Sequence, residues 1–284
     1  MSDECISERL EKEDGPEWVI CCGMRRGGST LQFQLVSAIA ELAGGKSVGL
    51  TSPETFTGQL KEYQDENVKL VFKCHKQISQ VREMLVDEKA KACYVYRDIR
   101  DVVVSIKNKY NRNFISFLRE QTIESILNEF QFWTQSDNMY ISRYEKMTSD
   151  LCQEIRNIAE YLGVDISAEH VEVIACRFSL ENQKNKIYNF DYQQNGAGEA
   201  NNRYDPSSLL HNNHIHSGKN EQWKSELSGL QAAYIEGKFG NWLQACGYTL
   251  SQPWLIRKVA GIIYWFALRF YLFGERVRKH QELT

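Results

Sequence analysis

The feature that most constrains the fold of this 284-residue chain is a glycine-rich loop between a strand and a helix. A short apolar run at 18–23 ends in glycine, as a buried strand does. The loop then reads Gly23-Met24-Arg25-Arg26-Gly27-Gly28-Ser29-Thr30. From Thr30 to Ala43, apolar residues recur at helical spacing until two glycines end the helix. A loop that opens a helix presents backbone N–H groups and the positive end of the helix dipole, so this pattern predicts an oxyanion site.

The residues of the loop indicate which anion it binds. Gly23, Gly28 and Thr30 stand where the phosphate loop of a nucleoside triphosphatase has its glycines and its hydroxyl residue. Ser29, however, takes the place of the lysine that reaches the β- and γ-phosphates, and the cation lies upstream at Arg26. We therefore predict a site for a 5′-phosphate, without magnesium-dependent cleavage of a triphosphate. A glycine-rich turn with two solvated arginines is the alternative.

Strands and helices alternate along the chain. Apolar runs predict strands at 18–23, 68–74, 92–97 and 139–144, and helical spacing predicts helices at 30–43, 77–89, 101–110, 123–137 and 149–162. This order favours an α/β fold, with a parallel sheet flanked by helices in the three layers of P-loop proteins. Such sheets bind ligands beyond the carboxyl ends of their strands. The Asn-, Gln- and Gly-rich stretch 183–213 has no periodicity and predicts a long loop of the kind that forms lids.

Two further groups of polar residues follow predicted strands. His75 comes directly after the second strand, where this architecture places chemistry, and a neutral imidazole is the usual general base for a hydroxyl. A structural histidine is the alternative. Arg97 ends the third strand and Ser105 follows eight positions later in a helix, so the two side chains can converge on one phosphate. An ordinary turn capped by Asp98 or Asp101 leaves Arg97 unexplained, because a cation near a helix N-terminus is unfavourable without an anion.

Together these motifs resemble those of the sulfotransferases that use 3′-phosphoadenosine 5′-phosphosulfate (PAPS), over roughly residues 19–248. The segment Arg26–Thr30 is similar to the family's 5′-phosphosulfate loop, Lys/Arg-Ser-Gly-Thr-Thr. It departs from that loop at Gly27 and Ser29, and both changes keep the backbone donors. Lys73-Cys74-His75 is similar to the family's Lys-Thr-His.

The resemblance continues towards the C-terminus. Arg97 and Ser105 match the arginine and serine that hold the 3′-phosphate, including their separation. Arg143-Tyr144-Glu145 is similar to the strand-end motif Tyr-Glu-Asp, which implies that Tyr144 lies near the adenosine. The segment His216-Ser217-Gly218-Lys219 falls where the family has Arg-Lys-Gly. It keeps the glycine, lacks both leading basic residues and adds a lysine, and the resemblance implies that it contacts the cosubstrate.

The resemblance also implies a function. Residues 15–250 would form a domain that binds PAPS as cosubstrate and transfers its sulfuryl group to a hydroxyl or amine of a small-molecule, lipid or glycan acceptor. His75 would be the general base. The loop Arg25–Thr30 would contact the cosubstrate, with Arg26 and the N–H groups that follow it stabilising the departing 5′-phosphate, and no metal would be required. Lys73 would assist the reaction or be solvated.

Two other classes of function stay open at this point. A P-loop small-molecule kinase would need a lysine where Ser29 stands, or a compensating cation, together with magnesium. A non-catalytic module that senses the nucleotide would need only the phosphate contacts, and the position of His75 argues against it. One fold serves many functions, so the motifs by themselves do not exclude either class.

The C-terminal segment 251–284 has a character of its own. The chain has 34 Lys+Arg against 37 Asp+Glu, a formal net charge of -3 that argues against bulk binding of nucleic acid. Residues 254–273 nevertheless read WLIRKVAGIIYWFALRFYLF, with three cations that make a membrane span unfavourable. Aromatics beside basic residues favour an amphipathic helix at a membrane surface, through residues 254–280. Docking of this helix on the domain, or on a second subunit of a homodimer, is the alternative.

Cysteine usage and the N-terminus indicate the compartment. The eight cysteines are scattered, without a C-x-x-C pair or metal-site spacing. The first 14 residues are highly charged and contain no apolar stretch, which argues against a signal peptide. We therefore expect a cytoplasmic protein with peripheral attachment to a membrane.

Overall fold

The computed structural model describes residues 15, 17–136, 138–199, 203–213, 215 and 217–281, with side chains described as far as residue 274. Five parallel strands form one sheet in the order β2-β3-β1-β4-β5. The strands are β1 (Glu17–Gly23), β2 (Lys46–Leu50), β3 (Lys69–Lys73), β4 (Ala90–Tyr96) and β5 (Met139–Arg143). Because β1 pairs with both β3 and β4, the carboxyl ends of these three strands lie side by side.

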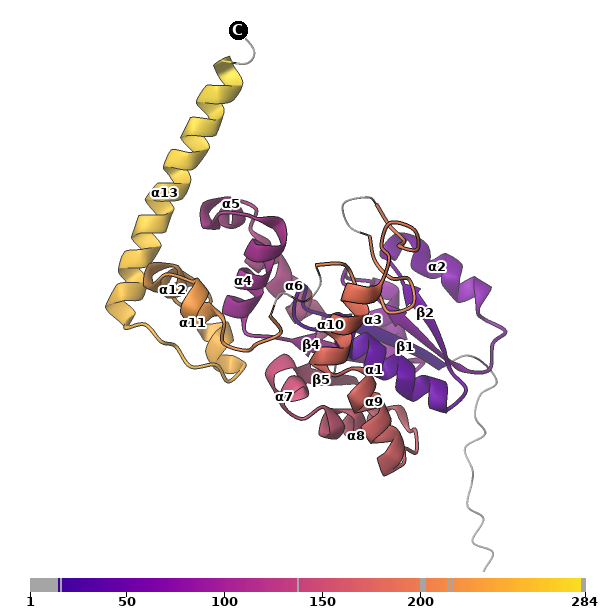
Figure 1. Ribbon diagram of the computed structural model, residues 1–284. Coiled ribbons are helices and arrows are strands. Elements are labelled where there is room, and N and C mark those ends of the chain that lie inside the picture. The colour runs from indigo at the N-terminus through magenta and orange to yellow at the C-terminus, as the bar shows by residue number, and fades with distance from the viewer. Residues whose placement is uncertain are drawn as a thin grey trace, which may run out of the picture.

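Helices connect the strands and follow the last of them. The first six are α1 (Ser29–Leu42), α2 (Pro53–Glu62), α3 (Ser79–Val86), α4 (Ile99–Tyr110), α5 (Phe114–Arg119) and α6 (Thr122–Trp133). After β5 come α7 (Tyr144–Ser149), α8 (Leu151–Leu162), α9 (Ala168–Arg177), α10 (Leu180–Asn189), α11 (Trp223–Glu226), α12 (Gly229–Ala245) and α13 (Trp254–Gln281). Figure 1 shows the sheet between these helices, and α13 beginning beside α12 and projecting away from the rest of the chain.

The sheet is buried on both faces because its strands are almost entirely apolar. In β1, Val19 and Cys21 belong to a core formed with α1, α8 and α9. The alternate residues Trp18, Ile20 and Cys22 belong to a second core that includes side chains of α3 and α6. This period of two is what a strand with a helical layer on each side requires. The predicted α/β fold, a parallel sheet between layers of helices, is confirmed.

The predicted long loop at 183–213 is wrong in its first part, because α10 continues through Asn189. This helix depends on polar contacts rather than on an apolar stripe. Ser179 Oγ accepts a hydrogen bond from the N–H of Asn182 at its start. Gln183 is buried and donates to Gln34 on α1. Hydrophobic periodicity therefore gave no signal for it. From residue 190 on, the described part of the stretch has only isolated bridges, such as Ala197 with Tyr204.

The sequence did not predict β2 and α2, which lie at the edge of the sheet. The strand β2 has no fully buried residue, and Phe56 is the buried side chain of α2, so neither has a strong apolar pattern. Ser52 nevertheless begins α2 with a capping box formed with Thr55. No helix in the described ranges is long and apolar enough to cross a membrane.

Candidate active site

The glycine-rich loop lies beyond the carboxyl end of β1 and turns directly into α1. The N–H of Gly27 donates to the carbonyl of Met24, 2.8 Å away, which closes a tight turn. Gly28 has a φ of 98°, and a Cβ there would lie 2.4 Å from Cδ2 of Tyr144. Only glycine fits both conditions. Since the Gly27 donor is used inside the loop, the N–H groups left to bind an anion begin at Gly28 and continue through the first turn of α1.

Arg26 joins the loop to α4. Its Nε donates to Oγ of Ser105 over 2.9 Å, so two residues that the sequence predicted for opposite ends of the nucleotide are in direct contact. Burial lowers the pKa of the Arg26 guanidinium, and the neighbouring charge of Arg97 lowers it further. The side chain remains a cation at neutral pH because the ordinary pKa of arginine is so high.

The side chain of Arg25 contacts a different helix from that of Arg26. Its Nη2 donates to Oγ of Ser125 over 2.9 Å, and its Nε lies 3.4 Å from a carboxylate oxygen of Glu129. Both partners belong to α6. The two adjacent arginines therefore contact different helices, Arg26 α4 and Arg25 α6. The sequence pattern does not show that their side chains diverge.

Lys73 is the last residue of β3, and His75 follows it two positions later. Lys73 is only 4% exposed and donates to Oγ1 of Thr30 over 2.5 Å, so the alternative of a solvated lysine is wrong. Burial lowers its pKa to about 7, and the charges of Lys109 and Arg26 act in the same direction. The ring of His75 is half-buried, with Nδ1 3.0 Å from the carbonyl oxygen of Gly23. Burial, with the charge of Lys73 as the second cause, lowers the pKa of His75 to about 4.

Arg97 follows β4 and is surrounded by three other elements. Its Nη2 donates to the carbonyl of Lys219 over 2.7 Å and lies 3.4 Å from Oδ2 of Asp101. The guanidinium stacks on the ring of Tyr144, 4.3 Å from its centroid. Its buried Nε has no hydrogen-bond partner among the described residues. A buried guanidinium donor with nothing to donate to is costly, and an anion would satisfy it.

The segment expected to cover this side meets Arg97 through its backbone, because the group bound is the carbonyl of Lys219. Ser217 Oγ accepts from the N–H of Lys219, 3.0 Å away, which bends the segment. Gly218 has a φ of 74°, and a Cβ there would lie 2.4 Å from Leu180. His216 lies outside the described residues. The sequence motif indicated this segment. It could not indicate the contact with Arg97, because a backbone carbonyl makes that contact and any residue type has one.

Lys109 is a residue of this site that the motifs missed. Burial lowers its pKa to about 8, and the charge of Arg26 contributes, which places the ammonium in the field of the loop. The available signal was its position in α4, one turn after Ser105 on the same face of the helix. Beside burial, the charges of Lys109 and Arg26 lower the pKa of Lys73, and the charge of Arg26 lowers that of Lys109. Such a cluster is suited to binding an anion of more than one charge.

These features fit one known class of protein. The chain matches the family described as Sulfotransferase domain over residues 16–247, and it therefore belongs to that family. The resemblance drawn from the sequence motifs is confirmed. Within the described residues, no group of three or more His, Cys, Asp or Glu side chains is arranged to hold a metal ion.

The individual relatives are distant. The chain is 24% identical over 172 residues to an amine sulfotransferase of Oryctolagus cuniculus, covering 55% of each protein. It is 23% identical over 201 residues to Sulfotransferase 1A1 of Mus musculus, covering 63% of this chain and 64% of the other. For Cytosolic sulfotransferase 1 of Arabidopsis thaliana, the identity is 25% over 138 residues, or 41% of this chain and 40% of the relative. The chain thus matches less than two thirds of the length of each.

Solved structures share the fold over more of the chain. Mouse sulfotransferase SULT7A1 complexed with PAP has a TM-score of 0.61 at 17% identity, covering 82% of this chain and 85% of that one. Retinol dehydratase in complex with androsterone and the inactive cofactor PAP has a TM-score of 0.56 at 20% identity, covering 83% and 82%. At this level of identity the similarity establishes the architecture.

The environment of Arg97 predicts how a change there affects ligand binding. Arg97→Ala should weaken the binding of 3′,5′-adenosine bisphosphate about 10- to 100-fold, because a charge-assisted hydrogen bond contributes about 1.5–3 kcal/mol. The binding of 5′-AMP should stay within about twofold, because it lacks the 3′-phosphate. Isothermal titration calorimetry measures both, with Arg156→Ala on the exposed side of α8 as the matched control. An unchanged affinity for the bisphosphate would remove Arg97 from the site.

Proposed function

We propose that the protein transfers the sulfuryl group of PAPS to a hydroxyl or amine of an acceptor, with His75 as the general base. The observation that carries this proposal is the convergence of Arg26, Lys73, His75, Arg97 and Ser105 at the carboxyl ends of three adjacent strands. This arrangement provides cations and N–H groups for two phosphates, and a base beside them.

The hydrogen bond of His75 supports the role of base. The carbonyl of Gly23 can only accept, so Nδ1 carries the proton of the neutral ring and Nε2 keeps its lone pair. A pKa of about 4 keeps the ring neutral at pH 7. Nε2 is therefore available to take the proton of an acceptor hydroxyl as that oxygen forms its bond to sulfur. The carbonyl of Gly23 also orients the ring.

The remaining residues have roles that follow from their charge. PAPS, when bound, supplies an activated sulfonate whose leaving group is a phosphate. Arg26, the protonated form of Lys73 and the N–H groups from Gly28 on would stabilise the charge that develops on the leaving oxygen. Arg97 and Ser105 would hold the 3′-phosphate, with Tyr144 between Arg97 and Gly28 as a wall for the nucleoside. Lys109 would add positive charge on the α4 side.

The kinase alternative is less well supported. Lys73 reaches Thr30 at the start of α1 and is the compensating cation that such an enzyme would need. The depressed pKa of Lys73, however, leaves a partial charge at pH 7, which suits a singly charged sulfonate better than a triphosphate. A sensing module would need no base, and the oriented imidazole of His75 favours an enzyme over a module.

Loss of the His75 base should lower the turnover rate while leaving nucleotide affinity nearly unchanged. His75→Ala should lower kcat about 10²- to 10⁴-fold, the usual contribution of a general base, while the affinity for 3′,5′-adenosine bisphosphate changes less than threefold. Release of the bisphosphate from PAPS in the presence of acceptor measures the rate. His170→Ala, at an exposed position on α9, is the matched control. Retention of full activity in His75→Ala would show that another group is the base.

The depressed pKa values predict an unusual pH profile. His75 acts in its neutral form, so kcat/KM for PAPS should fall only as the pH approaches about 4, and no acid limb should occur near 6.5. Lys73 acts in its protonated form, so kcat/KM should decline as the pH rises through about 7. Initial rates from pH 3.5 to 9 test both limbs, and Lys73→Met should flatten the alkaline one. An acid limb centred between 6 and 7 would contradict the environment assigned to His75.

We further propose that α13 attaches the protein peripherally, from the cytoplasmic side, to a membrane with anionic lipids. One face of the helix packs on α12 and α5. Ala260 is buried there, and Tyr264 contacts the rings of Phe114 and Tyr234 at 5.0 and 5.1 Å. A different face of the helix is apolar and exposed. Over about five turns it carries Ile256, Val259, Ile263, Phe266, Phe270 and Phe273.

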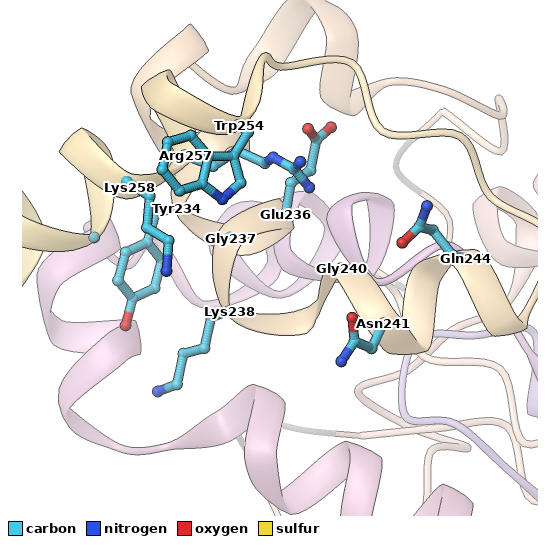
Figure 2. A pocket seen from close by; sticks show the side chains of 11 residues that line it. Tyr234, Glu236, Gly237, Lys238, Gly240, Asn241, Gln244, Trp254, Arg257 and Lys258 are labelled. Carbon is cyan, nitrogen blue, oxygen red and sulfur yellow. The ribbon is translucent and has the colours of Figure 1, made fainter.

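The edge of this apolar face carries paired cations and aromatics. Lys258 lies over the ring of Trp254 at 5.8 Å, and Arg269 over the ring of Trp265 at 4.3 Å. A helix held between the domain and a bilayer would place such residues at the level of the headgroups. Below the first turn of α13 is a cavity of about 530 Å³ whose lining includes Arg257, Lys258 and Lys238. Figure 2 shows these side chains on α12 and at the start of α13.

Substitution of the exposed phenylalanines of α13 tests whether this helix binds a membrane. The triple substitution Phe266→Ser, Phe270→Ser and Phe273→Ser should lower binding to phosphatidylserine-containing vesicles at least tenfold, because insertion of each ring contributes about 1.5–3 kcal/mol. Co-sedimentation measures binding, and Tyr188→Ser, which removes an aromatic side chain that is 89% exposed elsewhere, is the control. Equal sedimentation of the triple variant would reject the proposal. A dimer of the native chain that the variant abolishes would assign the face to a second copy.

A further inference from the structure

The cavity between α12 and the first turns of α13 contains more positive than negative charge. Its volume of about 530 Å³ lies within the range of small-ligand sites. Three cationic side chains, Lys238, Arg257 and Lys258, and one carboxylate, Glu236, are among the residues that line it. Figure 2 shows these four side chains on the two helices. We call this space the basic cavity, because its lining has an excess of two positive charges.

The carboxylate of Glu236 does not compensate this excess. One of its oxygens lies 2.6 Å from Nη1 of Arg100, a residue that does not line the cavity, so its charge is already paired. Lys238 in turn forms an ion pair with Glu124 of α6. The two cations at the start of α13 therefore provide the uncompensated charge of the lining.

The guanidinium of Arg257 lies where α12 and α13 approach each other closely. A Cβ at Gly237 would lie 3.1 Å from the carbonyl oxygen of Arg257, and a Cβ at Gly240 would lie 3.5 Å from its Nη1. The two glycines thus leave the space that the first turn of α13 occupies. Nε of Arg257 is buried and has no hydrogen-bond partner within the described ranges. An anion in the cavity would satisfy this donor, whose burial without an acceptor is unfavourable.

The other polar side chains of the lining indicate what carries the anion. Asn241 and Gln244 of α12 line the cavity and are exposed, so their amides can bind hydroxyl groups. The guanidinium of Arg257 favours a phosphate, because it can donate two parallel hydrogen bonds to the phosphate oxygens. A phosphomonoester carries close to two negative charges at neutral pH, which matches the excess in the lining. The basic cavity therefore fits a phosphomonoester of a polyol.

The edge of the basic cavity adjoins exposed apolar side chains of α13. Trp254 and Lys258, which line the cavity, and Ile262 are spaced four residues apart and follow one stripe of the helix. Trp254 is 64% exposed and Ile262 is 60% exposed. A phosphate held in the cavity would have this stripe beside it for acyl chains, which a water-soluble ester lacks. These surroundings favour the headgroup of a lipid over a free ester.

We propose that the basic cavity binds the headgroup of a phosphoinositide, an anionic lipid with a phosphomonoester on a polyol. This inference rests on the membrane attachment proposed above and names the lipid that it recognises; it does not depend on sulfuryl transfer. Arg257 and Lys258 would bind the phosphate, and Asn241 and Gln244 the neighbouring hydroxyl groups. The general attraction of α13 to anionic lipids would then be accompanied by selection of one headgroup.

Vesicles of equal surface charge separate selection from general attraction. The full chain is co-sedimented with vesicles that contain either phosphatidylinositol 4-phosphate or phosphatidylserine, at matched zeta potential. It should bind the phosphoinositide vesicles about tenfold more tightly or better, because charge-assisted hydrogen bonds are added to the attraction of the surface. Arg257→Gln and Lys258→Gln should each reduce this preference to less than about threefold. Asn241→Trp, which fills the cavity without changing its charge, should do the same while leaving the binding of phosphatidylserine vesicles intact.

Arg269→Gln is the matched control, because it removes one cation from an exposed position of the same helix outside the cavity. It should lower the affinity for both kinds of vesicle about fivefold and leave their ratio unchanged. Calorimetry with 3′,5′-adenosine bisphosphate verifies that each variant is folded. A preference that survives in both Arg257→Gln and Lys258→Gln would overturn the assignment of the site.

Two further outcomes distinguish this inference from the membrane attachment on which it rests. Equal affinity of the native chain for both kinds of vesicle would overturn the headgroup site and leave the attachment standing, whereas binding to neither would reject both. The soluble headgroup, glycerophosphoinositol 4-phosphate, is titrated by calorimetry without vesicles. It should bind at least about tenfold more weakly than the phosphoinositide vesicles, because it lacks acyl chains to contact α13. An affinity equal to that of the vesicles would assign the cavity to a free phosphate ester instead of a lipid.

Discussion

The buried guanidinium of Arg97 is the interaction on which the arrangement of the site depends. Three segments that are distant in sequence meet around it, because a buried cation must be surrounded by groups that stabilise its charge. Asp101 provides the negative charge, Tyr144 the ring face and Lys219 the carbonyl. Asp101 also accepts from the N–H groups of Glu221 and Trp223, at 2.9 Å each, so one carboxylate fixes both the arginine and the start of α11.

A second buried arginine, three residues later, connects the site to the C-terminal helices. Arg100 lies 2.7 Å from a carboxylate oxygen of Asp98 and 2.6 Å from one of Glu236 on α12. Glu236 also accepts from the N–H groups of Ser251 and Gln252, just before α13. The guanidinium stacks on the ring of Trp223, 3.8 Å away. The same turn after β4 therefore orients both the predicted 3′-phosphate contacts and the helix that we assign to the membrane.

The parts of this structure that sequence could predict are those where one residue type has one physical use. Three patterns mark the carboxyl ends of strands in the sequence: glycines before a helix, a histidine after one strand and an arginine after the next. Because the strands are parallel and adjacent, the fold brings these ends together. The clustering of Arg26, Lys73 and Arg97 at one edge of the sheet follows from this, as does the α/β architecture. A helix at the position of α13 was likewise predictable, because apolar residues recur there at helical spacing from Ile256 to Phe273.

Other features depend on contacts that no pattern encodes. A serine cap and a buried glutamine set the position of α10. Lys219 contacts Arg97 through its backbone carbonyl, which has no side-chain pattern. The sequence gives Arg25 and Arg26 the same residue type, yet Arg26 donates to α4 and Arg25 donates to α6. The burial of Lys73 required knowledge of Thr30 in three dimensions. Local motifs thus indicated where the candidate site lies, whereas tertiary contacts determine which partners each side chain meets.

The central claim is that one pocket holds an adenosine nucleotide with phosphates at both the 5′ and 3′ positions. A crystal structure of the full chain with 3′,5′-adenosine bisphosphate tests it most directly. We predict density for the 5′-phosphate at the start of α1, beside Arg26 and Lys73. The 3′-phosphate should lie within hydrogen-bond distance of Arg97 and Ser105. Density for the nucleotide elsewhere on the molecule, or in this pocket with its 3′-phosphate turned towards solvent, would contradict the account.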